Sequence, residues 1–163
     1  MRKIVVYILT LMMVAAACTS IDCPVQNKVS TLYALHKANG NADTLKVDTL
    51  FVTIERTDGS DSLLLNGITG VSSFELPISH TQPEDVFCLT LCDTLGNEYE
   101  DTIWVQKEDY AHFESVDCHA TYFHKITDIR HTDNIIESVD INNSNVNYDP
   151  KTEHFYIVFK ARY

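Results

Sequence analysis

Glycine is scarce in this chain, and its scarcity narrows the chemistry that the protein could perform. Only five of the 163 residues are glycine, and no glycine-rich loop of the kind that holds phosphate groups is present. The Gly-x-Ser-x-Gly sequence of hydrolases with a nucleophilic serine is missing too. Glu98, Glu100 and Asp101 stand in one predicted strand, whereas a glycosidase needs its two carboxyl groups on facing elements. We therefore predict no catalytic residue and no enzyme activity.

Basic residues are also few. The chain has 12 lysines and arginines against 23 aspartates and glutamates, a formal net charge of −11. Removal of residues 1–17 would take away Arg2 and Lys3 and no acid, leaving ten basic side chains against 23 acidic ones and a net charge of −13. An acidic surface repels nucleic acids and anionic lipid head groups, so we expect neither as a partner.

No window longer than ten residues has the 3.6-residue apolar period of a helix. Alternation of apolar and polar residues instead predicts strands, at 29–37, 48–56, 62–66, 72–79, 86–93, 99–107, 112–130, 135–142 and 154–162. For 112–130 we expect one long strand or two strands separated by a bulge, and Pro77 places 72–79 at a sheet edge or a bulge. Eight or nine short strands predict an all-β, antiparallel β-sandwich, loosely immunoglobulin-like, with a closed barrel as the alternative.

The longest apolar run covers residues 4–14 and falls short of the roughly 20 residues that a membrane span needs. Arg2 and Lys3 precede it, and three alanines and Cys18 follow it, an order typical of a secretory signal. Cysteine directly after small residues resembles the bacterial lipobox, where the chain is cut before a diacylglyceryl-modified cysteine. We predict a signal peptide at 1–17, a lipidated tether at 18–28 and one domain at 29–163. An ordinary secretory signal and an uncleaved anchor are the alternatives.

With Cys18 lipidated, four cysteines remain, an even number that suggests disulfides in an exported domain. Cys88 and Cys92 would lie about 13 Å apart on one face of the strand at 86–93, too far for a bridge whose Cα atoms must come within about 7 Å. We prefer a single Cys23–Cys118 bridge, with Cys88 and Cys92 as buried thiols. Two other solutions stay open: 23–88 with 92–118, and 23–92 with 88–118.

Five segments share the order Asp, then Ser or Thr, then an aliphatic residue, and they contain Thr44, Thr49, Ser62, Thr94 and Thr102. One interpretation is structural, because Asp favours turns while Thr and aliphatic residues favour the strands that follow them. The other is a resemblance to the three-residue O-glycosylation signal of exported Bacteroidetes proteins. Each modified hydroxyl would then have to lie in a loop or at an exposed strand end.

Four histidines between residues 112 and 131 lie close to Cys118 in the sequence. Zinc needs three or four converging ligands, but His119 and His124 have opposite parity on a regular strand and would point to opposite faces. A calcium-like run begins at Asp140, yet it has Asn145 where the loop needs glycine and Lys151 where it needs glutamate. We therefore predict neither a metal site nor a cofactor.

Four short motifs resemble a group of uncharacterised Bacteroidetes lipoproteins: Asp22-Cys23-Pro24, Gly67-x-x-Gly70-Val71-Ser72-Ser73-Phe74, His112-Phe113-Glu114-Ser115-x-x-Cys118 and Val146-Asn147-Tyr148-Asp149. The resemblance runs from the signal nearly to the C-terminus. It implies lipidation at Cys18, paired status of Cys23 and Cys118, and glycosylation of the hydroxyls above. It implies no catalytic residues.

The expected function is that of an envelope-anchored lipoprotein, lipid-tethered at the outer membrane on its periplasmic or surface face. It would act as a non-catalytic structural or accessory interaction module, with the membrane and an envelope protein or a glycan as partners. The alternative is a glycan- or peptide-binding lipoprotein, which would show an exposed aromatic platform or a deep groove. A hydrolase is the third hypothesis, and it would need two titratable groups converging in a pocket.

Overall fold

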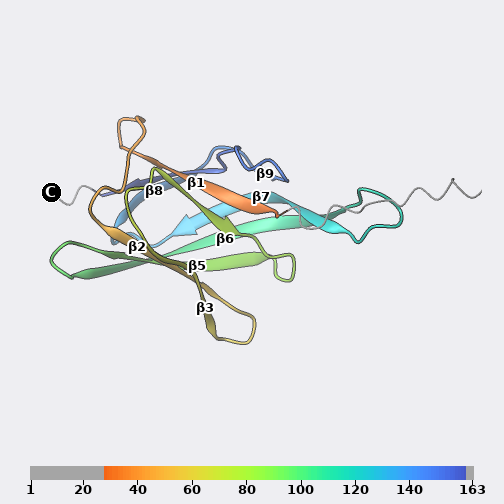
Figure 1. Cartoon of the computed structure of the whole chain (residues 1–163), viewed down its shortest axis with the longest axis horizontal. Coiled ribbons are helices and arrows are strands. Elements are labelled where there is room, and N and C mark those ends of the chain that lie inside the picture. Colours follow the sequence, from red (N-terminus) through yellow and green to blue (C-terminus); the bar gives the residue numbers. More distant parts are fainter. Residues whose placement is uncertain (1–27, 161–163) are drawn as a thin grey trace, which may run out of the picture.

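The computed structural model describes residues 28–160, which form ten strands and no helix (Figure 1). The strands are β1 (Ser30–His36), β2 (Thr49–Glu55), β3 (Asp61–Ile68), β4 (Ser73–Pro77), β5 (Glu84–Cys92), β6 (Glu98–His112), β7 (Thr121–His131), β8 (Ile136–Ile141), β9 (Asn145–Val146) and β10 (Phe155–Phe159). They make a four-stranded sheet in the order β4-β1-β10-β8 and a six-stranded sheet in the order β3-β2-β5-β6-β7-β9. The prediction of an all-β sandwich is confirmed. Within residues 28–160 no helix is long and apolar enough to span a membrane.

Side-chain alternation decides which face of each strand is buried. In β5, Phe87, Leu89 and Leu91 are almost fully buried, and the residues between them are partly exposed. Because successive side chains point to opposite faces, one face of each strand can enter the core between the sheets. Leu50 of β2 and Phe155 of β10 reach the same core from the two sheets. The strand alternation seen in the sequence is therefore the alternation that builds the sandwich.

Nearly all strand pairs are antiparallel, as predicted, but β1 and β10 pair in parallel, from Tyr33 opposite Phe155 to His36 opposite Val158. The sequence did not predict this pair. Lys28 precedes β1 and Lys160 follows β10, so the two ends of the described chain lie at opposite ends of the sandwich. Strand β4 is at a sheet edge, as Pro77 predicted.

The prediction of a strand or a bulged strand pair across 112–130 was partly wrong. Strand β6 continues to His112, residues 113–120 form a hairpin loop, and β7 begins at Thr121. Strand β5 pairs with β6 only as far as Gln106. Residues 107–112 of β6 therefore extend beyond β5, by about 20 Å at 3.4 Å per residue, in a ribbon made with β7. Figure 1 shows this ribbon, in green and cyan, reaching past β5.

Candidate functional site

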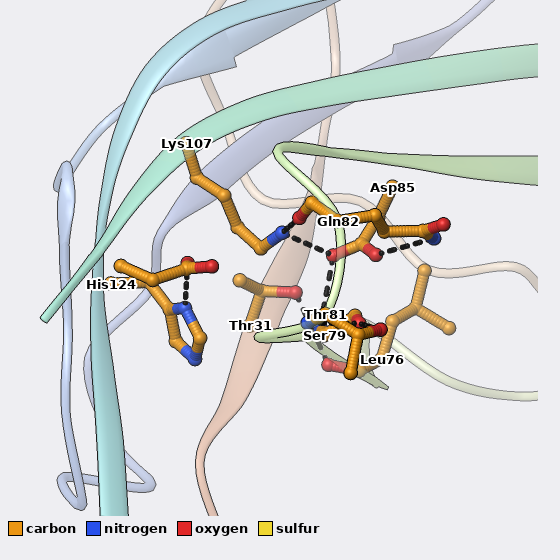
Figure 2. Close-up of polar contacts among 9 residues, drawn as sticks. Thr31, Leu76, Ser79, Thr81, Gln82, Asp85, Lys107 and His124 are labelled. Atoms are coloured by element: carbon orange, nitrogen blue, oxygen red, sulfur yellow. Dashed lines mark hydrogen bonds and ion pairs between the residues drawn. The ribbon is translucent and has the colours of Figure 1, made fainter. Parts of the chain in front are cut away.

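Two oppositely charged side chains are buried between the sheets. Asp85 begins the inward-facing series of β5, and Lys107 continues the inward face of Ile103 and Val105 in β6. Both side chains are fully buried, and Lys107 Nζ lies 3.3 Å from Asp85 Oδ2 (Figure 2). A charged pair removed from water must satisfy its remaining hydrogen-bonding groups within the protein.

The neighbouring loop supplies those hydrogen bonds. Lys107 Nζ donates to the Gln82 carbonyl at 2.6 Å, and the Gln82 side-chain amide donates to Asp85 Oδ1 at 3.2 Å. The backbone N–H of Ser79 donates to Asp85 Oδ2 at 3.0 Å. Lys107 is also fixed through its backbone N–H, which donates to the Pro83 carbonyl. The pair thus fastens the segment between β4 and β5 onto β6.

A second polar pair lies next to the first. Asp109 and His124 are directly opposite each other on β6 and β7, with Asp109 Oδ1 2.6 Å from His124 Nδ1. Burial lowers the pKa of His124 below its ordinary value, although the hydrogen bond and the charge of Asp109 raise it; Lys107 lowers it further. The imidazole is therefore neutral at pH 7 and donates its Nδ1 proton to Asp109. Figure 2 shows His124 and Lys107 pointing into the same interior region.

Two polar side chains of the facing sheet, Thr31 and Tyr33, are also buried in the interior. Thr31 donates its hydroxyl to the Leu76 carbonyl at 3.2 Å, and Tyr33 is fully buried between the rings of Phe74 and Phe155. Burial raises the pKa of Tyr33, so the phenol stays protonated. The Thr31 hydroxyl and the Tyr33 ring are therefore part of the packed interior, and neither residue lines the pocket described next.

A pocket of about 510 Å³ lies at the opposite end of the sandwich, where β1 and β10 end. Its lining includes the apolar side chains of Leu35, Leu45 and Phe159. It also includes three lysines and three carboxylates, at Lys37, Lys46, Lys160, Asp43, Asp48 and Glu137. Within residues 28–160, no group of three or more His, Cys, Asp or Glu side chains is arranged to hold a metal ion.

An exposed aromatic surface covers the outer face of the β6–β7 ribbon. Tyr110 lies opposite Phe123, and Tyr148 joins them from the segment between β9 and β10. The Phe123 ring stacks on His112 with centroids 4.3 Å apart and meets Tyr148 edge-on at 4.8 Å. Tyr110 meets Phe123 edge-on at 6.2 Å and is 46% exposed. We call Tyr110, His112, Phe123 and Tyr148 the aromatic patch; Tyr110 is exposed and the other three side chains are partly exposed.

The cysteines separate into two kinds. Cys88 and Cys92 are free and partly exposed on the outer face of β5, so the prediction of buried thiols was wrong. Strand alternation assigns the inward positions to Phe87, Leu89 and Leu91, which leaves Cys88 and Cys92 on the outer face. Partial burial, then the nearby Glu100, raises the pKa of Cys88. The thiolate fraction is therefore small at pH 7.

Cys118 lies in the hairpin loop and is disulfide-bonded. Because Cys88 and Cys92 are free, its partner is neither of them, and both two-bridge solutions are ruled out. Cys23, the predicted partner, and Cys18, the predicted lipid site, lie outside the described residues. The Cys23–Cys118 bridge therefore stays a prediction, as does lipidation.

The five candidate glycosylation sites occupy different environments. Thr44 and Thr94 are exposed in loops, whereas Thr49, Ser62 and Thr102 are partly buried within β2, β3 and β6. The requirement stated for modification, a loop or an exposed strand end, is met at Thr44 and Thr94. Thr49 and Ser62 lie at the starts of β2 and β3 but are partly buried, and Thr102 lies inside β6.

The aspartates of two of these motifs have structural roles. Asp93 accepts hydrogen bonds from the backbone N–H groups of Leu95 and Asn97 in the β5–β6 turn. Asp101 is 2% exposed and accepts hydrogen bonds from the Thr132 hydroxyl and from the backbone of the β7–β8 connection. Here the structural interpretation of the motif accounts for the aspartate.

Sequence reasoning missed the buried pairs and the aromatic patch. Parity along β6 was the available signal, since Ile103 and Val105 predict an inward Lys107 and an inward Asp109. A lysine on a core face requires an acidic partner, and that requirement points toward Asp85. Nothing local placed Tyr148 beside Phe123, because they belong to segments that meet only in the folded chain.

Comparison with known proteins gives one match. A model described as a family of unknown function (DUF6452) matches residues 49–159, which is more than half of the chain and runs from β2 through β10. No curated protein matches the sequence. No solved structure matches it either. The chain therefore belongs to DUF6452, a family of unknown function.

Proposed function

We propose that this chain is an exported lipoprotein, anchored through Cys18 in the outer membrane of a Bacteroidetes cell, and that it acts as a non-catalytic interaction module. The support from the sequence is the order of basic residues, apolar run, small residues and cysteine in 1–18. The short motifs shared with Bacteroidetes lipoproteins add to it. Family membership is compatible with this proposal and assigns no activity.

The observation that carries the proposal is the disulfide of Cys118. Disulfides persist in exported proteins and are rare in the reducing cytosol. A bridge to Cys23 would close a loop of nearly a hundred residues and contribute about 3–5 kcal/mol in the chain-entropy model. It would also join the domain to the chain only five positions after Cys18, which would keep the sandwich close to the membrane surface.

The non-catalytic part of the proposal rests on how the converging titratable groups are used. Lys107 and Asp85 are fully buried and bonded to each other, and Asp109 and His124 form a second pair. A general base must be within reach of a substrate proton. These four groups instead pair within the six-stranded sheet, and the first pair also holds the β4–β5 segment in place.

The test is expression of the full chain in a Gram-negative host, followed by intact-mass measurement of the detergent-extracted protein. The expected product begins at Cys18 and carries a diacylglyceryl group, and it fractionates with the outer membrane. A Cys18→Ala variant is the matched control and should lose both the acyl mass and the membrane fraction. A mature chain beginning elsewhere without lipid would contradict the anchoring proposal.

A second candidate function is supported by the aromatic patch, which could bind a glycan or an extended peptide. Aromatic rings present flat apolar faces to sugars and side chains, and Tyr110 adds a hydroxyl for hydrogen bonding. The test is binding to glycan and peptide arrays, with Tyr110→Ala expected to reduce binding. Tyr99→Ala is the matched control, because Tyr99 is 40% exposed near the start of β6, outside the patch. Equal binding by both variants would reject the patch as the site.

A further inference from the structure

The hairpin loop at residues 113–120 exposes two apolar side chains at the end of a projecting ribbon. Phe113 is 60% exposed and Val116 is 96% exposed. Below them, Tyr110 and Tyr122 are 46% and 37% exposed. Strand pairing puts these two tyrosines on opposite faces, since Tyr110 lies opposite Phe123 and Tyr122 is its neighbour in β7. The ribbon therefore ends in two exposed apolar side chains, and one exposed tyrosine follows on each of its two faces.

This end of the molecule is also where the described chain begins. Strand β1 starts with Ser30 opposite Pro77, and His80, three residues further on, stacks on Tyr122 at 4.4 Å. Lys28 therefore lies at the same end as the hairpin loop. Residues 1–27 precede Lys28 and contain the apolar run and both remaining cysteines, Cys18 and Cys23. Cys118 of the loop is disulfide-bonded, but not to Cys88 or Cys92, and the predicted bridge to Cys23 would join the loop to that segment.

We propose that the hairpin loop is a membrane-contact surface. Phe113 and Val116 insert among the acyl chains beside the lipid anchor, and Tyr110 and Tyr122 lie at the level of the head groups. Tyrosine suits that depth because its ring is apolar and its hydroxyl is polar. This inference rests on the proposed anchoring, since the anchor supplies most of the membrane affinity and the loop fixes the orientation.

The charge of the loop specifies the lipid. Residues 113–120 contain Glu114 and Asp117 but no lysine or arginine, and both acids are exposed. Anionic head groups would repel them, whereas basic clusters are what draw proteins to anionic lipids. The expected surface is therefore a zwitterionic one, such as phosphatidylethanolamine or phosphatidylcholine.

The experiment measures the depth of a tryptophan placed in the loop. Trp104 is the only tryptophan, so a Trp104→Phe background is silent. Phe113→Trp reports on the loop, and Leu95→Trp is the matched control, because Leu95 is 86% exposed in the turn at the other end of β6. Each variant is reconstituted into phosphatidylcholine vesicles with and without brominated acyl chains. In a second format, an N-terminal hexahistidine replaces residues 1–17 and binds nickel-chelating lipid, so attachment no longer depends on acylation.

In both formats, tryptophan at position 113 should emit at shorter wavelength on vesicles and lose intensity to brominated lipid, while tryptophan at 95 should do neither. A water-like, unquenched signal at position 113 would overturn the proposal, and so would equal quenching at both positions. A blue shift induced by soluble glycan fragments but not by vesicles would show that a glycan is the occupant. Quenching in the hexahistidine format with no acyl group in the native protein would leave membrane contact standing and reject the anchoring proposal.

Discussion

Replacement of Asp101 by asparagine gives the most direct test of how the two sheets are held together. Asp101 lies on β6, and its carboxylate accepts hydrogen bonds from the Thr132 hydroxyl and from the backbone N–H groups of Asn134, Ile135 and Ile136. Residues 132–135 connect β7 of one sheet to β8 of the other. One carboxylate therefore accepts hydrogen bonds from four residues at the point where the chain passes from one sheet to the other.

The expected cost follows from the number and kind of these bonds. A hydrogen bond to a charged acceptor contributes about 1.5–3 kcal/mol, and bonds to one group do not add fully. Asparagine keeps one acceptor oxygen but turns an NH₂ group toward backbone N–H donors. We expect Asp101→Asn to lower the free energy of unfolding at pH 7 by about 3 kcal/mol. Asp128→Asn is the control, because this substitution removes the same charge at an exposed position of β7.

The effect should depend on pH in a defined direction. Burial raises the pKa of Asp101, but the hydrogen bonds from Thr132 and the following backbone outweigh it, so the folded-state pKa lies below the ordinary value. A lowered folded-state pKa stabilises the fold at pH values above the unfolded-state pKa of about 3.9. That stabilisation is lost as pH falls through the folded-state pKa. The difference between wild type and Asp101→Asn should thus be full at pH 7 and shrink below about pH 4.

The measurement is urea unfolding followed by the fluorescence of Trp104, with the two aspartate variants compared at pH 7 and at pH 3. If Asp101→Asn lowered the free energy of unfolding at pH 7 by less than about 1 kcal/mol, the reasoning would be refuted. A change that small corresponds to the loss of a single ordinary hydrogen bond. A difference that persists unchanged at pH 3 would refute it as well, since the carboxylate would then not be acting through its charge.

Three further predictions concern the buried pair, the thiols and the modified hydroxyls. Lys107→Met should lower the free energy of unfolding, measured in urea, by about 3–5 kcal/mol because it leaves a buried unpaired carboxylate. Adding Asp85→Leu should restore most of that stability. If the single variant were no less stable than the double variant, the result would count against the pairing. Both β5 thiols should react slowly with iodoacetamide in the folded protein while Cys118 reacts only after reduction, as counted by intact mass; alkylation of Cys118 without reductant would contradict its bonded state. In the native host, Thr94→Ala should remove a glycan from the intact mass and Thr102→Ala should not, because only Thr94 is exposed in a turn; the reverse result would reject selection by exposure.

The sequence predicted the strands well because each strand depends on a local pattern. The alternation of Leu50 and Val52 in β2, or of Phe155 and Ile157 in β10, is set by neighbours two positions apart. The same reasoning failed at 113–120, a segment with the apolar residues Phe113 and Val116 that was predicted as part of one long strand or of two strands separated by a bulge. Both residues are exposed in a loop instead, and no local rule assigns an apolar residue to a loop.

The missed features have non-local causes. The parallel pairing of β1 with β10 joins residues more than a hundred positions apart, and nothing in either segment specifies its direction. Alternation correctly predicted that Cys88 and Cys92 share one face of the strand. The hydrophobic residues around them then suggested, wrongly, that this face is the buried one. The volume of Phe87, Leu89 and Leu91 decided it, since these larger side chains bury more apolar area than a thiol.

The parallel pairing of β1 with β10 also determines which surfaces are available to a partner if the N-terminus is anchored. The strands run along one axis, so the loop that contains Phe113 and the turn that contains Leu95 are separated by the 15 residues of β6, about 50 Å at 3.4 Å per residue. An anchor before Lys28 would hold the first of these against the membrane and point the second away from it. The pocket near Lys160 lies at the second end, because β10 finishes there. A soluble partner would therefore meet the pocket and the β5–β6 turn, whereas the aromatic patch would face ligands at the membrane surface.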